Sequence, residues 1–187
     1  MKSLVFATSN EMKFMMADVV CRSHGIQLVR KNADIEEVQG EDAEKVAIDK
    51  ADKMYVALKE PLVITDDSWA FSGLRGFPGV YMHSINKWLT PQDFLNLTLS
   101  LKDRRVTLTM RLVYNNDVEQ KIFQANLSGK ILKEARGESK YANHTVVSLD
   151  GDEGKSIAEV YEKQDLGADH NASKVWHDFA KWYSDQE

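Results

Sequence analysis

Cysteine is almost absent from this chain of 187 residues, which contains Cys21 alone. A single cysteine cannot form an internal disulfide or supply a cysteine-rich zinc site. We therefore expect a reducing, cytoplasmic location. The five histidines add no metal motif, because none has the spacing of an H-E-x-x-H site.

Long apolar runs are also absent, and so is an excess of positive charge. No run approaches the roughly 20 apolar residues that a membrane helix needs, and the apolar part of "MKSLVFATSN" is too short for a signal peptide. We therefore expect no membrane partner and interpret the N-terminus as part of the mature fold. The net charge of −5 gives no general attraction to nucleic acid. An anionic ligand would need a local basic cluster or a metal ion.

The composition is that of an ordinary folded domain. Hydrophobic residues make up 43% of the chain and charged residues 28%, and we find no internal repeat or low-complexity tract. The length fits one domain over residues 1–187, or at most two small lobes that share one core.

Strand and helix patterns alternate in the first part of the chain. Residues 3–8 predict a buried strand, and the following "SN" supplies capping residues for a helix that begins near Glu11. A second strand is expected from Gly25, and residues 42–58 place their apolar side chains on one helical face. Lys50 lies on or beside that face, where a lysine needs a partner.

The rest of the chain predicts a mixed arrangement. "PLVIT" indicates a central strand that ends at the two aspartates, and "TPQDFLNLTLSL" a helix with Thr90 as its cap. Alternating runs on both sides of "NND" predict a β-hairpin, "LSGKIL" and "HTVVSL" two further strands, and residues 172–183 an amphipathic helix. We therefore expect a mixed α/β protein with an antiparallel hairpin section, not a regular doubly wound one.

Asp66 and Asp67 follow an apolar strand directly. Adjacent carboxylates repel each other unless a cation lies near them, and Mg²⁺ takes oxygen ligands of this kind. For an isolated pair, capping of a turn is the simpler interpretation. A phosphatase of the haloacid-dehalogenase type is disfavoured, because it needs a second acid two positions on, where this chain has Ser68 and Trp69.

"ATSNEMK" has the properties of a phosphate-binding turn. Hydroxyl and amide side chains precede a helix, whose N-terminal N–H groups favour an anion, and Lys13 adds a positive charge. The segment lacks the glycines and the Lys-Ser/Thr pair of a Walker loop. Taken alone, it is also explained as a capped helix with a surface lysine, just as the acids of "EEVQGED" are explained as a solvated loop.

The ordered set of segments resembles the inosine triphosphate pyrophosphatase family, whose members hydrolyse non-standard purine nucleoside triphosphates to monophosphate and pyrophosphate. The signals are "FATSNEMK", "EEVQGEDAEKVAIDKA", "VITDDSWAF" followed by "LRGFPGVY", and then "EKQ" and "DHN". They occur in family order and cover most of the chain. The resemblance implies an elongated mixed central sheet flanked by helices, a nucleotide cleft between two lobes, and a homodimer.

The resemblance also implies roles for individual residues. Glu37 and Asp67 match metal-binding carboxylates, with Asp66 beside them, and Asp67 also matches the proposed proton acceptor. Mg²⁺ is the implied cofactor, and a nucleoside triphosphate the implied substrate. The substrate-binding positions are Thr8, Ser9, Asn10, Lys13, Lys50, Ser68, Lys163 and His170.

The implied mechanism is an attack of water on the α-phosphorus. Mg²⁺ neutralises phosphate charge and makes a bound water more acidic, while Asp67 accepts the proton of that water. The lysines stabilise the negative charge of the leaving pyrophosphate.

The chain departs from the family pattern where the base is recognised. The family's Gly-Phe-Gly-Tyr/Trp-Asp segment is replaced by "GESKYANHT", in which Tyr141 stands for an aromatic residue and Asn143 or His144 for the aspartate. The family's Ser-His-Arg is Asp169-His170-Asn171 here, and the loop between "DDS" and "PGVY" is one residue shorter. We therefore expect altered base selectivity.

Two other interpretations stay open from the sequence. A nucleotide-binding or regulatory homologue with weak or no catalysis would explain the changed base segment, but it has less need of Glu37, Asp67, Lys13 and Lys50. A pyrophosphatase for another modified base is the second alternative.

Overall fold

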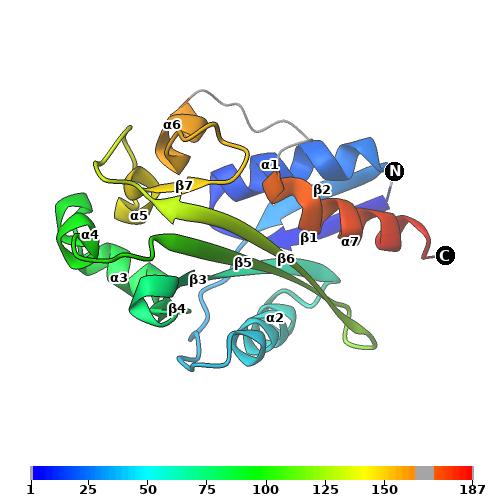
Figure 1. Ribbon diagram of the computed structural model, residues 1–187. Coiled ribbons are helices and arrows are strands. Elements are labelled where there is room, and N and C mark those ends of the chain that lie inside the picture. The colour runs from blue at the N-terminus through cyan, green and yellow to red at the C-terminus, as the bar shows by residue number, and fades with distance from the viewer. Residues whose placement is uncertain (1, 163–170, 187) are drawn as a thin grey trace. The chain divides into compact units, whose positions relative to one another are not determined.

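The computed structural model describes residues 2–162 and 171–186, whose helices and strands are shown in Figure 1. The strands are β1 Lys2–Ala7, β2 Ile26–Lys31, β3 Leu62–Phe71, β4 Pro78–Gly79, β5 Arg105–Asn115, β6 Gln120–Ile131 and β7 Val147–Leu149. The helices are α1 Glu11–Ser23, α2 Ala43–Leu58, α3 Met82–Trp88, α4 Pro91–Thr98, α5 Ala142–Val146, α6 Ile157–Glu162 and α7 Lys174–Ser184. Short 3₁₀ turns occupy Ser72–Leu74 and Asn171–Ser173.

The strands form a mixed sheet. Their order is β2-β1-β3-β5-β6-β7, with β4 paired to β3. Strand β1 pairs in parallel with β2 and β3, whereas β3 and β4, and β6 and β7, pair antiparallel. The predicted mixed α/β class is confirmed.

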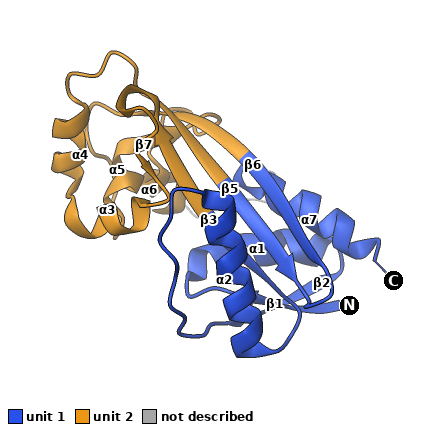
Figure 2. Cartoon of the chain, turned by 90° about the horizontal axis from the view of Figure 1, so that it is seen from below, with its two compact units in different colours: residues 1–66, 110–125, 167–187 blue, residues 67–109, 126–166 orange. Residues whose placement is uncertain are grey.

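The chain divides into two compact units (Figure 2). Unit 1 comprises residues 1–66, 110–125 and 167–187, and unit 2 comprises residues 67–109 and 126–166. Strands β3, β5 and β6 each contribute residues to both units. The expected nucleotide cleft between two lobes stays a prediction.

Side chains that alternate along β1 build the core of unit 1. Phe6 is fully buried and packs edge to face on Trp176 of α7, with ring centroids 4.8 Å apart. Its neighbours Val5 and Ala7 belong to a buried cluster with Ala47 of α2. Because successive strand residues point to opposite faces, α7 and α2 cover opposite faces of β1 (Figure 1).

Helix caps follow the sequence signals. The Asn10 side chain accepts a hydrogen bond from the N–H of Lys13 at the start of α1, and Asp42 caps α2. Thr90 and Asp93 form a reciprocal capping box at the start of α4 in unit 2, with Pro91 at the first helical position. The three predicted helix starts are therefore confirmed.

Three sequence predictions are wrong in detail. Strand β3 does not end at the aspartates but continues to Phe71, because Trp69 and Ala70 pair with β4. "LSGKIL" is not a separate strand, since residues up to Ile131 belong to β6. In "HTVVSL" only Val147–Leu149 form a strand, and the preceding residues complete α5.

Two further findings concern Cys21 and membrane insertion. Cys21 is a free, buried thiol whose pKa is raised to about 12, mainly by burial and in addition by the charge of Asp18. Within the described part of the chain, no helix combines the length and the apolar character needed to cross a membrane.

Candidate functional site

The predicted phosphate turn lies in unit 1, between β1 and α1. The N–H of Asn10 donates to the Thr8 hydroxyl oxygen at 3.1 Å, and the N–H of Lys13 donates to the Asn10 side chain at 3.2 Å. The N–H of Thr8 donates to the carbonyl of Lys31 on β2 at 2.9 Å. These bonds link the turn to β2 and to the start of α1, and Ser9 is exposed within it.

Lys50 of α2 joins two of the predicted metal-binding carboxylates. Its Nζ atom lies 3.0 Å from Glu37 Oε1 and 3.5 Å from Asp66 Oδ1, and all three residues belong to unit 1. The side chains of Lys50 and Asp66 are 20% and 19% exposed, whereas Glu37 is 48% exposed. Lys50 is therefore paired with two carboxylates, Glu37 and Asp66, which come from two different segments of the chain.

Electrostatics in this cluster favour the charged lysine. Burial alone would lower the pKa of Lys50, but the negative charges of Asp66 and Glu37 outweigh burial and raise its pKa above the ordinary value. The ammonium group therefore acts as the cation of the cluster.

Asp67 is the first residue of unit 2. Its Oδ1 atom is buried, and its charge contributes, after burial, to raising the pKa of Tyr161 on α6 to about 12. Asp66 and Asp67 are successive residues of β3 and belong to different units. The joint binding of a metal ion by Glu37 and Asp67 stays a prediction.

Ring side chains contact one another at the segment "GESKYANHT", within unit 2. His144 lies between Tyr141 and Tyr161, with ring centroids 5.0 Å and 5.4 Å away. Asn143 is 1% exposed, and its side-chain oxygen accepts a hydrogen bond from the amide of Asn86 at 2.8 Å. Asn143 thus supports the fold of unit 2, whereas His144 is only half-buried.

The residues around Lys50 fit a magnesium ion. Across residues 2–162 and 171–186, no three His, Cys, Asp or Glu side chains converge closely enough to hold a metal ion by themselves. Mg²⁺ does not require this, since it is usually held by one or two carboxylates together with waters and substrate phosphates. Glu37 and Asp66, which converge on one cationic group, provide such a pair of oxygen ligands.

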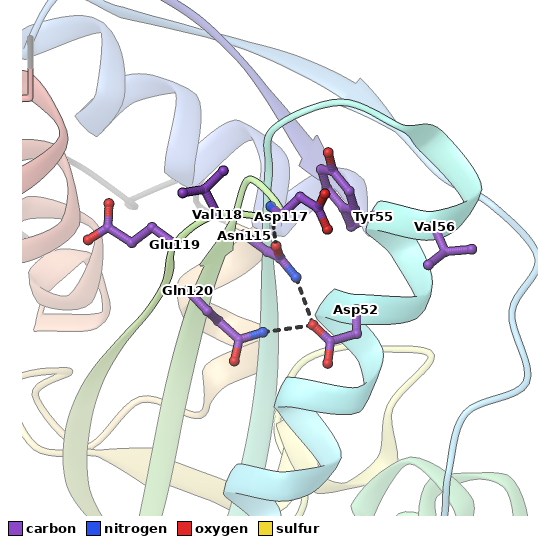
Figure 3. Close-up of a pocket in the computed structure, with 8 residues that line it drawn as sticks. All are labelled: Asp52, Tyr55, Val56, Asn115, Asp117, Val118, Glu119 and Gln120. Carbon is purple, nitrogen blue, oxygen red and sulfur yellow. Dashed lines mark hydrogen bonds between the residues drawn. The ribbon is translucent and has the colours of Figure 1, made fainter.

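A hollow of about 320 Å³ in unit 1 is lined by none of the predicted site residues that the structure describes (Figure 3). Its lining includes Asp52, Asp117 and Glu119 but no basic side chain, which disfavours an anionic ligand. The Asp52 carboxylate accepts hydrogen bonds from the amides of Asn115 and Gln120, at 2.7 and 2.8 Å. These bonds tie α2 to the β5–β6 hairpin.

Three predicted substrate-binding positions remain, which are Ser68, Lys163 and His170. Ser68 lies on β3 in unit 2 and is half-buried. Lys163 and His170 lie outside the described residues. Sequence reasoning missed Tyr161, although this aromatic residue stands directly before the "EKQ" motif.

Comparison with known proteins identifies the family. The model of the Ham1 family matches residues 4–175, which is most of the chain. The chain belongs to the Ham1 family. This assignment agrees with the resemblance seen in the sequence motifs.

Several relatives of this chain carry names that state a specific reaction. The dITP/XTP pyrophosphatase of Saccharolobus solfataricus is 23% identical over 182 residues, which cover 96% of this chain and 94% of the relative. The inosine triphosphate pyrophosphatase of Yarrowia lipolytica is 28% identical over 151 residues, which cover 80% of this chain and 79% of the relative.

A solved structure shows the same fold. The HAM1 protein from Coxiella burnetii superimposes with a TM-score of 0.80 at 20% identity, and the match covers 100% of both chains. The mixed sheet flanked by helices is therefore the Ham1 fold.

Proposed function

We propose that this protein is a Mg²⁺-dependent nucleoside triphosphate pyrophosphatase that hydrolyses non-standard purine nucleoside triphosphates, such as ITP, dITP and XTP, to monophosphate and pyrophosphate. The observation that carries the proposal is the cluster of Lys50, Glu37 and Asp66. The phosphate turn belongs to the same unit, since Ala7, which precedes it, packs in one core with Ala47 and Ala51 of α2. Membership of the Ham1 family and the names of the relatives support the same reaction.

The residues of unit 1 are suited to hold a triphosphate. The turn at Thr8, Ser9 and Asn10 offers hydroxyl, amide and helix N-terminal N–H groups, and Lys13 adds a cation in the first helical turn. Mg²⁺, when bound by Glu37 and Asp66, supplies neutralisation of phosphate charge and a more acidic water.

In the proposed reaction, Asp67 accepts the proton of the water that attacks the α-phosphorus. A carboxylate in this role must be ionised and must lie within hydrogen-bond reach of the water. The buried Oδ1 atom of Asp67 and the neighbouring Tyr161 provide a shielded setting within unit 2. Lys163 completes the proposed phosphate contacts.

The direct test of the proposal is a substrate panel. We expect the wild-type protein to release pyrophosphate from ITP, dITP and XTP with Mg²⁺, and to lose this activity when EDTA removes the metal. Pyrophosphate and the nucleoside monophosphate are both measured, because their equal yield shows that the bond between the α- and β-phosphates is the one that is hydrolysed. Measurable nucleotide binding without turnover would instead support the binding or regulatory homologue.

We also propose that base selectivity is altered. A protein discriminates against a wrong base when that base leaves buried polar groups unpaired. Here Asn143 or His144, the latter in ring contact with two tyrosines, takes the place of the family's aspartate, and Asn171 takes the place of its arginine. The same panel is extended to dUTP and the four common triphosphates. We expect ITP to be hydrolysed with little preference over these other triphosphates. A sharp preference for ITP would contradict the proposal. Turnover of dUTP above the purines would indicate another modified base as the substrate.

A homodimer is the oligomeric state that we propose, on the basis of the family resemblance. Light scattering is expected to give twice the chain mass of 21.3 kDa. A single chain mass over the micromolar range would contradict this proposal.

A further inference from the structure

We infer that the Lys50 ammonium occupies, in the metal-free protein, the cation position between Glu37 and Asp66, and that it leaves this position for the substrate phosphates when Mg²⁺ binds. This inference rests on the proposed function, because it assigns the same residues to a metal ion and a triphosphate. The new element is that the Lys50 ammonium and Mg²⁺ bind the same two carboxylates, Glu37 and Asp66, one after the other.

The geometry of the cluster supports this exchange. Lys50 Nζ contacts oxygens of both carboxylates, at 3.0 Å for Glu37 and 3.5 Å for Asp66. Mg²⁺ binds oxygens at about 2.0–2.1 Å and keeps most of its waters. An ammonium group in contact with both carboxylates therefore competes with the ion for the same oxygens, and like charges at such short range repel strongly.

The charges of the cluster favour replacement of the lysine by a divalent ion. Two carboxylates and one ammonium group leave one negative charge, whereas two carboxylates and Mg²⁺ are neutral. Lys50 starts from a helix face whose neighbours Ala47 and Ala51 are buried, and its flexible stem allows the ammonium to turn away without moving α2. The released ammonium can then contact an anionic group.

The exchange gives one side chain two successive partners. In the metal-free protein the ammonium is held by carboxylates, so it is not available to a phosphate. After the exchange, the Lys50 ammonium is available to contact a phosphate of the substrate. The protein therefore prepares its lysine for the substrate only when the metal ion is present.

The test measures Mg²⁺ binding to the substrate-free protein by calorimetry, in wild type, Lys50→Met and Lys50→Arg. We expect Lys50→Met to bind Mg²⁺ at least about tenfold more tightly than wild type, because the competing cation is gone. Lys50→Arg keeps the charge and donates from a planar fork, so it is expected to bind Mg²⁺ no more tightly than wild type. Lys45→Gln is the matched control, since Lys45 is on the same helix but is 83% exposed and pairs with Asp42.

Chemical labelling of the wild-type protein supplies a second readout that needs no variant. Mild reductive methylation followed by peptide mass spectrometry is expected to label Lys50 faster when Mg²⁺ is added, with Lys45 as the internal reference. Unchanged labelling of Lys50 at saturating Mg²⁺ would overturn the inference. So would equal or weaker Mg²⁺ binding by Lys50→Met, or no Mg²⁺ binding by either protein.

These outcomes are separable from failure of the proposed function. A wild-type protein that releases pyrophosphate from ITP but shows no change in Lys50 labelling contradicts only the exchange. A protein that shows the exchange and hydrolyses none of the triphosphates contradicts only the proposed function.

Discussion

An Asp67→Asn variant is expected to turn over ITP about 10²–10⁴-fold more slowly than wild type, which is the usual contribution of a positioned general base. Asparagine has the shape of aspartate but cannot accept a proton from water. The substitution lies within β3, whose backbone continues to Phe71, so the strand is expected to remain intact. The measurement is the rate of pyrophosphate release at saturating ITP and Mg²⁺, with circular dichroism to verify the fold.

Asp52→Asn is the matched control for this experiment. Asp52 is a carboxylate of unit 1 outside the predicted site, where it accepts hydrogen bonds from Asn115 and Gln120. We expect this variant to keep the wild-type rate. Full Mg²⁺-dependent activity in Asp67→Asn would contradict the assignment of Asp67 as the proton acceptor.

A Trp176→Ala variant is expected to lose about 3–5 kcal/mol of the free energy of unfolding, as is typical when a large buried aromatic side chain is truncated. Trp176 is 1% exposed, and its ring contacts those of Phe6 and Phe179, with centroids 4.8 and 6.0 Å away. Alanine would leave a cavity between α7 and β1 that these rings cannot fill without moving. Urea denaturation followed by circular dichroism gives the loss.

Trp88→Ala removes the same side chain from an exposed position. Trp88 is 73% exposed at the end of α3, so its truncation is expected to change the free energy of unfolding by no more than about 0.5 kcal/mol. Equal losses in the two variants would show that burial of Trp176 is not what stabilises unit 1.

The longer elements were predictable from the sequence, and the short ones were not. Helix α2 has 16 residues, enough for its apolar period to be read, and Asp42 marks its start. Helices α3, α5 and α6 have 7, 5 and 6 residues, which is too short for a periodic signal, so packing decides their conformation. The extension of β3 past the aspartates depends on its pairing with β4, which the pattern of β3 alone does not contain.

The contacts within the candidate site could not be predicted from local sequence patterns either. The position of Lys50 on an apolar helix face predicts that it needs a partner, but the periodicity of α2 cannot say which one. Glu37 comes from a segment without regular structure and Asp66 from a strand, so only the tertiary fold brings them to one ammonium group. Tyr161 reaches the neighbourhood of Asp67 from α6, a helix that the sequence did not predict.

The composition of unit 1 has a consequence for folding during synthesis. Unit 1 draws on residues 1–66 and again on residues 167–187, whereas unit 2 ends at residue 166. During synthesis, Phe6 therefore cannot pack on Trp176 until α7 has left the ribosome exit tunnel. The residues of unit 2 leave the tunnel earlier. A nascent chain halted before α7 should expose the apolar surface of β1 to chaperones, even though its phosphate turn and Lys50 are already present.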